Sequence, residues 1–293
     1  MIDQITNLPI VKTHYKGKVR DILDLGKNLL IITSDRISAY DVVFPDEIPE
    51  KGILLNQISA FFFKQTKNII QNHFITDNID EMPTELHVFK DFLDKRSMLV
   101  KKTRVIPFEC IVRGYISGSA WNEYKNSGTV GGVILSEEIK QSQRFPEPHF
   151  TPSTKASEGH DENISYKKMC ERMDHDIAEQ IKNVSIELYK WAHHFLLEKG
   201  IILADTKFEF GTNAGELYLI DEIFTPDSSR FWDKEDYEIG ISPNSYDKQF
   251  VRDFVVNSGW DKQVPAPQLP NDIIQKTCEK YKTIYTKIIG LES

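Results

Sequence analysis

The strands and helices that the sequence predicts fit an α+β fold, and three observations support this class. Residues 205–210 alternate between polar and apolar side chains, which is typical of a half-buried strand. Apolar side chains recur at helical spacing over residues 174–199, where Gly200 supplies the stop. A second helical segment, over residues 271–289, follows a linker marked by prolines. The chain therefore combines sheet structure with long helices.

The composition has the values usual for a soluble globular protein. The chain has 293 residues, of which 40% are hydrophobic and 27% are charged, and this length is enough for a large core and two or three subdomains. The net charge of −8 argues against a general nucleic-acid binder, so we expect no nucleic-acid partner. The three cysteines are widely spaced and indicate neither a disulfide framework nor a zinc site.

The N-terminal residues lack the basic segment and apolar core of a secretory signal. No apolar run approaches the ~18 residues that are needed to span a bilayer. We therefore expect a cytoplasmic protein without a membrane partner.

The N-terminal segment predicts a small β unit, with a strand over residues 14–23 and a buried strand over residues 29–33. Lys16, Lys18 and Arg20 could supply positive charge to the phosphates of a nucleotide, and the glycine between the two lysines would let the backbone approach. The stretch lacks the P-loop pattern. Taken alone, it is better interpreted as a surface hairpin with solvated lysines.

Two loops carry candidate binding groups. Residues 34–41 form a polar loop, which precedes a helix predicted over residues 53–68. Residues 128–165 form a long connection rich in glycine and proline, and connections of this length are usually functional or disordered. The hydroxyl groups of this connection and Lys155 suit phosphate binding, but the same composition also suits a plain solvent loop.

Two strands are predicted over residues 97–103 and 106–113, joined by a short connector. Such a connector can line an adenine pocket, where an acid such as Glu109 accepts a hydrogen bond, but simple pairing of the two strands explains the pattern equally well. Residues 114–121 follow, with two glycines and two hydroxyls that can form a backbone nest for an anion. Arg113, directly before them, suits a phosphate or a carboxylate.

Residues 200–232 carry a dense group of charges. Asp205, Lys207 and Glu209 fall on one side of a period-two strand. A turn over residues 211–215 and a returning strand over residues 216–224 are predicted next. Carboxylates at this density either hold a hard cation such as Mg²⁺ or form a solvated face, and the charge pattern alone slightly favours the solvated face.

Several long motifs, in the same order along nearly the whole chain, are similar to those of the SAICAR synthetase family (phosphoribosylaminoimidazole-succinocarboxamide synthases) of purine biosynthesis. The motifs are KGKVRDI (16–22), SDRISAYD (34–41), IPEKGILL (48–55), VRGYISGSAW (112–121), FTPSTKASEGHDENIS (150–165), ADTKFEFG (204–211) and DEIFTPDSSRFW (221–232).

The resemblance implies the family's fold, which is a small antiparallel β N-terminal lobe plus a larger ATP-grasp-like α+β lobe with C-terminal helices. It implies a nucleotide-binding lobe over residues 1–105, a catalytic lobe over residues 106–264 and a C-terminal helix packed on the body over residues 265–293. The insertion at residues 150–165 resembles the longer, fungal-type branch of the family rather than the compact bacterial form. A monomer or a homodimer is expected.

The resemblance also implies the reaction, in which ATP drives the joining of L-aspartate to the carboxylate of carboxyaminoimidazole ribonucleotide (CAIR) through an acyl phosphate, with Mg²⁺. Such chemistry depends on positioning and charge neutralisation rather than on a protein nucleophile. The family's motifs place Asp205 and Lys207 at the reacting end, Lys16, Gly17, Lys18, Val19, Arg20, Lys101 and Glu109 on ATP, Ser38, Arg113, Ser119, Ser153, Lys155 and Arg230 on the substrate, and Glu209 and Asp221 on the metal ion.

The expected hairpin raises a geometric difficulty. If Phe210 pairs with Glu216, Asp221 lies opposite Asp205 and about four residues, or ~13 Å, from Glu209. That separation is too large for one metal ion. A longer turn, a bulge or a strong twist would be needed to bring the two acids together.

The sequence leaves two other functions to consider. A small-molecule kinase would typically need a base aspartate in a catalytic loop such as HRD, a motif that the sequence lacks. An inactive nucleotide-binding module would have lost the acids or the lysines named above, and all of them are present.

Overall fold

The structure is a computed structural model that describes residues 1–135, 138–155, 162–246 and 248–290. The chain divides into two compact units. Unit 1 comprises residues 1–65, 72–103 and 247–293, and unit 2 comprises residues 66–71 and 104–246. The three-part division expected above stays a prediction.

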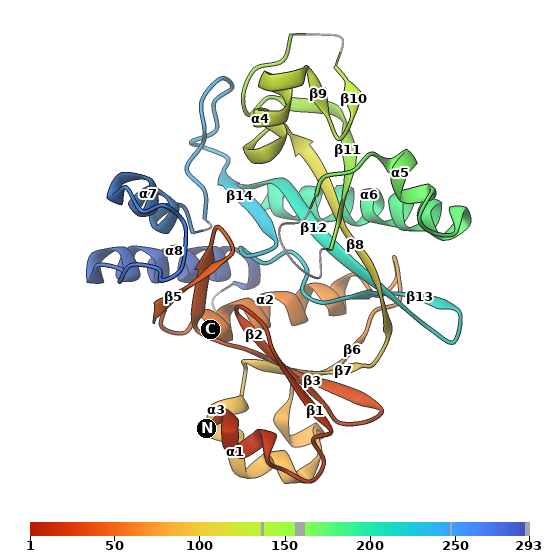
Figure 1. Cartoon of the computed structure of the whole chain (residues 1–293), viewed down its shortest axis with the longest axis vertical. Helices are drawn as coiled ribbons and strands as arrows, with labels where there is room; N and C mark the ends of the chain where they lie inside the picture. Colours follow the sequence, from red (N-terminus) through yellow and green to blue (C-terminus); the bar gives the residue numbers. More distant parts are fainter. Residues whose placement is uncertain (136–137, 156–161, 247, 291–293) are drawn as a thin grey trace. The chain divides into compact units, whose positions relative to one another are not determined.

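Unit 1 is built on a five-stranded antiparallel sheet in the order β1-β2-β3-β7-β6 (Figure 1). Its strands are β1 (Thr13–Lys16), β2 (Arg20–Asp24), β3 (Asn28–Thr33), β6 (Phe74–Thr76) and β7 (Ser97–Lys101), and a separate hairpin is formed by β4 (Arg36–Ala39) and β5 (Val42–Glu47). Its helices are α1 (Ile2–Thr6), α2 (Lys51–Gln65), η1 (Ile79–Glu81), η2 (Thr84–Phe89), α3 (Lys90–Leu93), α7 (Gln249–Ser258) and α8 (Asn271–Ile289). The helix α8 packs along α2, and its buried Tyr281 and Ile284 face inward.

The single strand expected over residues 14–23 is wrong. The chain turns back after Lys16, so that β1 and β2 pair with each other in an antiparallel hairpin. The amide of Gly17 donates to the carbonyl of Arg20 at 2.8 Å and closes this turn. The Lys-Gly-Lys stretch is therefore the tip of a hairpin, a position that the apolar alternation could not reveal because it continues through the turn.

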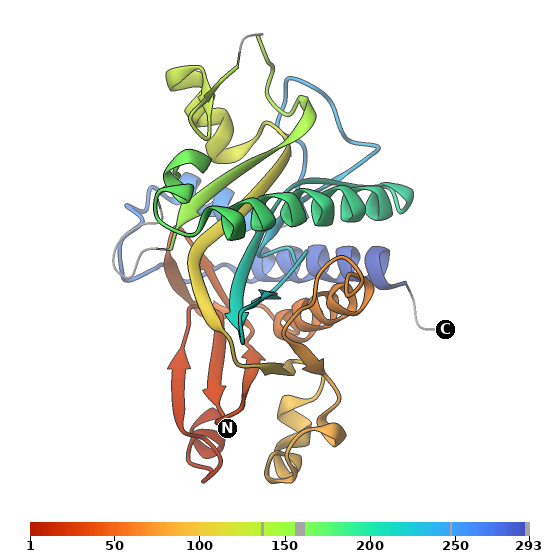
Figure 2. The same cartoon turned by 90° about the vertical axis from the view of Figure 1, so that its right-hand side faces the viewer.

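Unit 2 is built on a sheet in the order β11-β8-β12-β13, and β14 also pairs with β12. Its strands are β8 (Arg104–Tyr115), β11 (Arg144–Thr154), β12 (Ile201–Asn213), β13 (Glu216–Ile220) and β14 (Ser229–Asp233), with a short pair formed by β9 (Thr129–Val130) and β10 (Val133–Ile134). Its helices are α4 (Gly118–Ser127), α5 (Tyr166–Cys170) and α6 (His175–Glu198). The long helix α6 crosses one face of β8, β11 and β12 (Figure 2).

The structure corrects one expectation for the centre of the chain. The connection expected over residues 128–165 contains the 11-residue strand β11, which carries three prolines. Proline cannot donate to a sheet, and β11 is tolerated because it lies at the sheet edge. The two strands expected over residues 97–103 and 106–113 are confirmed as β7 and β8. Of the alternatives left open for them, simple pairing with each other is excluded, because each belongs to a different sheet.

The two long helices expected from the sequence are confirmed. Helix α6 begins after Asp174, whose carboxylate accepts from the amides of Asp176 and Ile177 and so stabilises the N-terminus. Helix α8 has the predicted bounds, 271–289, and starts after Pro270. In the part of the chain that the structure describes, no helix is both long enough and apolar enough to cross a membrane.

Candidate active site

The strand register of unit 2 gathers the charged residues on one face of its sheet. Asp205 pairs with Arg113 on β8 and with Arg230 on β14. Four residues further along β12, Glu209 pairs with Glu109, which in turn pairs with Ser153 on β11. Residues that pair directly across antiparallel strands share a face of the sheet. Six of the residues that the sequence singled out, with Lys207 between the two rungs, therefore lie on one surface.

This surface is not the solvated face that the charge pattern alone favoured. Glu209 is 4% exposed, Arg113 is 5% exposed and Asp205 is 9% exposed. Charges that are buried to this extent must be paired or hydrogen-bonded. They form two groups, which we call the lysine–carboxylate cluster and the arginine cluster.

The lysine–carboxylate cluster is centred on Lys207. Its ammonium lies 2.5 Å from Oε1 of Glu109 and 3.2 Å from Oε1 of Glu209. The second oxygen of Glu209, Oε2, accepts from Lys155 Nζ at 2.6 Å. Burial alone would lower the pKa of Lys207, but the negative charges of Glu209, Glu109 and Asp221 raise it well above its ordinary value. Lys207 is therefore a cation that forms ion pairs with two adjacent carboxylates and offsets one of their two negative charges.

The hairpin register resolves the position of Asp221. Phe210 pairs with Leu219 and not with Glu216, because the turn is only the two residues 214–215 and β12 continues to Asn213. The expected five-residue turn is wrong. The expectation that a longer turn, a bulge or a strong twist would be needed to bring Glu209 and Asp221 together is also wrong, because the turn is shorter than expected. Glu209 now pairs with Ile220, the neighbour of Asp221. At Asp221 the backbone is left-handed, with φ of 70°, so the chain leaves the strand next to Glu209.

The arginine cluster surrounds Asp205. Oδ2 of Asp205 accepts from Arg230 Nη1 at 2.6 Å and from the Ser117 hydroxyl at 3.2 Å. Arg113 Nη1 lies 3.8 Å from the same oxygen. The Arg113 side chain also donates to Thr151 Oγ1 at 2.9 Å and to Ser119 Oγ at 3.2 Å. One carboxylate thus holds two guanidinium groups side by side. The three side chains together carry one net positive charge, which is suited to binding an oxyanion.

Gly118 fixes the position of Arg230. Its backbone has φ of +55°, and a Cβ added here would lie 2.6 Å from Nη2 of Arg230. A side chain at this position would therefore push the guanidinium away from Asp205. Gly118 is the first residue of helix α4. Because it has no side chain, the first turn of the helix can lie in contact with the Arg230 guanidinium.

The remaining predicted residues lie in unit 1. Lys16 ends β1, Gly17 to Val19 form the hairpin tip, and Arg20 begins β2. Lys18 Nζ lies 2.5 Å from Asp41 Oδ1.

Lys101 pairs with Asn28, whereas Arg20 pairs with Thr33 at the other end of β3. Five residues of strand, or ~17 Å, separate these two ends, so the structure does not bring Lys101 to the hairpin tip. The carbonyl of Ser38 accepts from Lys248 Nζ at 3.0 Å.

Two hydroxyl groups of the site were not among the predicted residues. Ser117 bonds both Asp205 and Arg230, although the sequence had indicated an anion nest at residues 114–121. Thr151, the partner of Arg113, lies two residues before Ser153 on β11. The alternation of a strand would have pointed to it, but this segment was expected to be a loop.

Replacing Gly118 with alanine tests whether the glycine positions Arg230. We expect Gly118→Ala to lower the free energy of unfolding by about 1–2 kcal/mol more than the control Gly128→Ala, measured by denaturant titration. Gly128 is a matched control because it also has a positive φ, of +70°, but has no atom within 4 Å of an added Cβ. Equal losses in the two variants would show that Arg230 does not depend on Gly118.

Comparison with known proteins identifies the family. Residues 13–267 match the family model described as SAICAR synthetase. The phosphoribosylaminoimidazole-succinocarboxamide synthase of Geotalea uraniireducens is 52% identical over 97% of each chain, and that of Thermodesulfovibrio yellowstonii is 52% identical over 96% of each chain. The solved structure of the Saccharomyces cerevisiae SAICAR synthase complexed with SAICAR is 43% identical, with a TM-score of 0.88 over 97% of each chain. A SAICAR synthetase in complex with ADP is 25% identical, with a TM-score of 0.69 over 96% of this chain and 99% of that one. The chain belongs to the SAICAR synthetase family.

Proposed function

We propose that this protein uses ATP to join L-aspartate to the carboxylate of CAIR, giving SAICAR, ADP and phosphate. The observation that carries the proposal is the pair of charged clusters on one sheet face, set about four residues, or ~13 Å, apart along β12. One cluster suits a terminal phosphate and the other suits phosphoryl transfer. The family relationship supports the same reaction.

The arginine cluster binds the phosphoribosyl end of CAIR. Arg113 and Arg230 present guanidinium groups that can each donate two hydrogen bonds to a phosphate, and Ser119 adds a hydroxyl. Asp205, which the resemblance placed at the reacting end with Lys207, pairs with both arginines in this structure, and we propose that it holds them in place. The phosphate therefore meets donors that need little rearrangement.

The lysine–carboxylate cluster serves the reacting end. A carboxylate oxygen of CAIR attacks the γ-phosphorus of ATP, and the bond to the ADP oxygen breaks. The amine of L-aspartate then attacks the carbonyl carbon of this acyl phosphate, phosphate leaves, and the amine loses a proton as the amide forms. Lys207 and Lys155 neutralise the negative charge that accumulates on the transferred group. This work needs cations in fixed positions, and Lys207 is fixed by Glu109 and Glu209.

We assign ATP-binding roles to residues 16–20 and Lys101 of unit 1 and to Glu109 of unit 2, each taken separately. We assign Ser38, Ser153 and Lys155 to the substrate. Support for a nucleotide comes from the related synthetase that was solved in complex with ADP. Support for the hairpin tip comes from its geometry, since the backbone turns at Gly17 with Lys16 and Lys18 beside it.

Glu209 and Asp221 suit a Mg²⁺ ion that is shared with ATP. Mg²⁺ is usually held by one or two carboxylates, while substrate phosphates and water supply the other oxygens. Among the described residues, no three His, Cys, Asp or Glu side chains come together to hold a metal ion, so ATP and water would have to complete the coordination. A bound Mg²⁺ would neutralise the phosphates. Lys155, whose side chain is 44% exposed, can move from Glu209 to the phosphates when Glu209 takes the metal.

We also propose that the chain belongs to the longer branch of the family, which is then not restricted to fungi. The identity to the yeast enzyme is 43%, with a TM-score of 0.88, against 25% and 0.69 for the synthetase solved with ADP. The relatives at 52% identity are bacterial. Part of the insertion, residues 156–161, lies outside the described residues.

The reaction is tested by ADP release from purified protein with MgATP. We expect release to require both CAIR and L-aspartate, with SAICAR formed in equal amount. A kinase would release ADP without L-aspartate, and an inactive nucleotide-binding protein would release none. Either outcome would refute the proposed reaction.

The metal assignment is tested by Glu209→Gln and Asp221→Asn. Each change removes a carboxylate charge, so we expect Mn²⁺ binding in the presence of ATP to weaken and turnover to fall about a hundredfold or more. Glu216→Gln, an exposed acid on the same hairpin, is the matched control and should leave both properties unchanged. Near-wild-type Mn²⁺ binding in both site variants would remove the assignment.

A further inference from the structure

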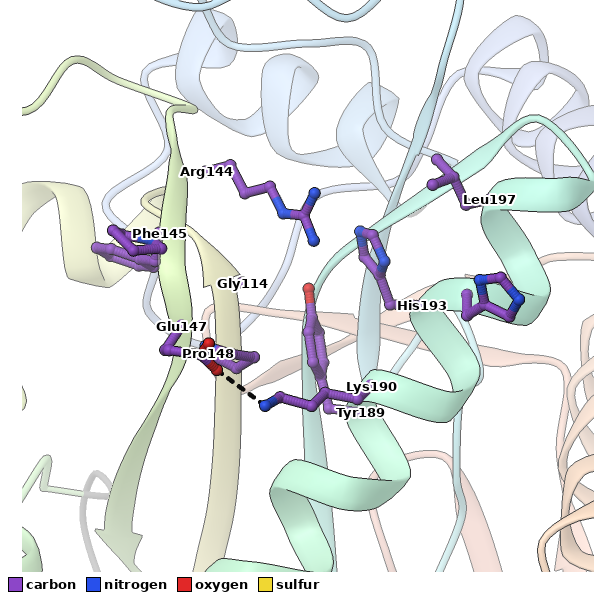
Figure 3. A pocket seen from close by; sticks show the side chains of 11 residues that line it. Gly114, Arg144, Phe145, Glu147, Pro148, Tyr189, Lys190, His193 and Leu197 are labelled. Atoms are coloured by element: carbon purple, nitrogen blue, oxygen red, sulfur yellow. Dashed lines mark hydrogen bonds and ion pairs between the residues drawn. The ribbon is translucent and has the colours of Figure 1, made fainter.

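A cavity lies on the other face of the sheet of unit 2, away from the charged clusters. It has a volume of about 300 Å³ and is lined by β8, β11 and helix α6 (Figure 3). Gly114 lines it on β8, one residue after Arg113, and successive residues of a strand point to opposite faces. The cavity is thus separated from the arginine cluster by the thickness of one sheet.

The cavity exists because β11 leaves β8 at this point. Arg144 pairs with Tyr115, and pairing resumes only at His149 with Arg113. Residues 145–148 therefore arch away from the sheet, and two of them are prolines that have no amide to donate. Gly114 makes room for Tyr189 in the cavity wall, since a Cβ there would lie 1.8 Å from the hydroxyl of Tyr189.

Arg144 supplies the charge in this cavity. Figure 3 shows its guanidinium extending towards Tyr189 and His193. Within residues 1–135, 138–155, 162–246 and 248–290, no hydrogen bond or ion pair engages this guanidinium. The other cation of the wall, Lys190, is neutralised by Glu147 at 2.8 Å. The cavity therefore carries one uncompensated positive charge and a planar set of donors.

His193 supplies a second donor. Burial, reinforced by the positive charge of Arg144, lowers the pKa of His193 to about 4, so the ring is neutral at pH 7. Its Nε2 lies 3.2 Å from the hydroxyl of Tyr115. If that hydroxyl donates to Nε2, the ring proton lies on Nδ1, which can then donate to a ligand. The hydroxyl of Tyr189 is already committed, because it donates to the carbonyl of Leu203 at 2.6 Å.

We propose that this cavity binds a small molecule through one oxyanion group, a phosphate or a carboxylate, held by the Arg144 guanidinium and by Nδ1–H of His193. The body of the ligand lies against Tyr189 and Leu197. The site is distinct from the proposed catalytic face. It nevertheless borders β8, the strand that carries Arg113, and Tyr189 bonds the backbone of β12 two residues before Asp205.

The imidazole proton signals of His193 provide a direct test by NMR. The signals are assigned with His193→Gln, and the protein is titrated at constant ionic strength with inorganic phosphate and, separately, with succinate. We expect a saturable shift with at least one of the two anions, and the stronger binder identifies the group. Arg144→Met should weaken this binding about tenfold or more, because a charge-assisted pair is lost.

Two control variants make the result decisive. Arg172→Met removes an equal charge from an exposed position of the same unit, and Arg230→Met removes an arginine of the proposed catalytic face. Both should keep the His193 shift. The proposal is wrong if neither anion gives a saturable shift, if Arg144→Met binds like the wild type, or if the shift is lost in Arg230→Met, since it would then report binding on the other face. None of these outcomes depends on whether the protein makes SAICAR.

Discussion

The ion pairs of Lys207 are the interaction on which the rest of the site depends. The sheet register places Glu109 and Glu209 directly opposite each other on neighbouring strands. Two like charges in such a pair repel each other, and burial strengthens the repulsion because the local dielectric constant is low. Lys207 touches both carboxylates and makes this register possible. With Lys207 present, the side chains of Lys207, Glu109 and Glu209 together carry one net negative charge.

The same register produces the arginine cluster at the neighbouring rung, where Asp205 plays the role that Lys207 plays for the carboxylates. In each cluster one central charge is shared by two opposite charges, so each side chain is held in place before any ligand arrives. Fixed donors of this kind lose little freedom when a transferred phosphoryl group develops charge. The clusters thus explain how a surface without a protein nucleophile can serve the proposed ligation.

The sequence predicts those features that local chemistry determines. Helix α6 was predictable because its apolar residues repeat at helical spacing and Gly200 follows its end. The strand face of Asp205, Lys207 and Glu209 was predictable from alternation. The family was predictable from long motifs, although a resemblance assigns residues to roles and does not give distances.

Pairing between distant strands was not predictable in the same way. The turn at residues 214–215 differs from the expected one by three residues, and that shift decides whether Glu209 pairs with the neighbour of Asp221. Strand β11 was missed because its three prolines resemble a loop, and only its edge position makes them acceptable. The separation of β7 from β8 into different sheets depends on tertiary packing, which no local pattern records.

The central claim is that Lys207 holds Glu109 and Glu209 together, and a double-mutant cycle tests it most directly. The free energy of unfolding is measured without metal or nucleotide for wild type, Lys207→Met, Glu109→Gln and the double variant. We predict that Lys207→Met alone costs about 2–3 kcal/mol, because two facing carboxylates lose their cation. Adding Glu109→Gln should then recover at least about 1 kcal/mol, because the repulsion is removed. Additive losses in the double variant would contradict the claim.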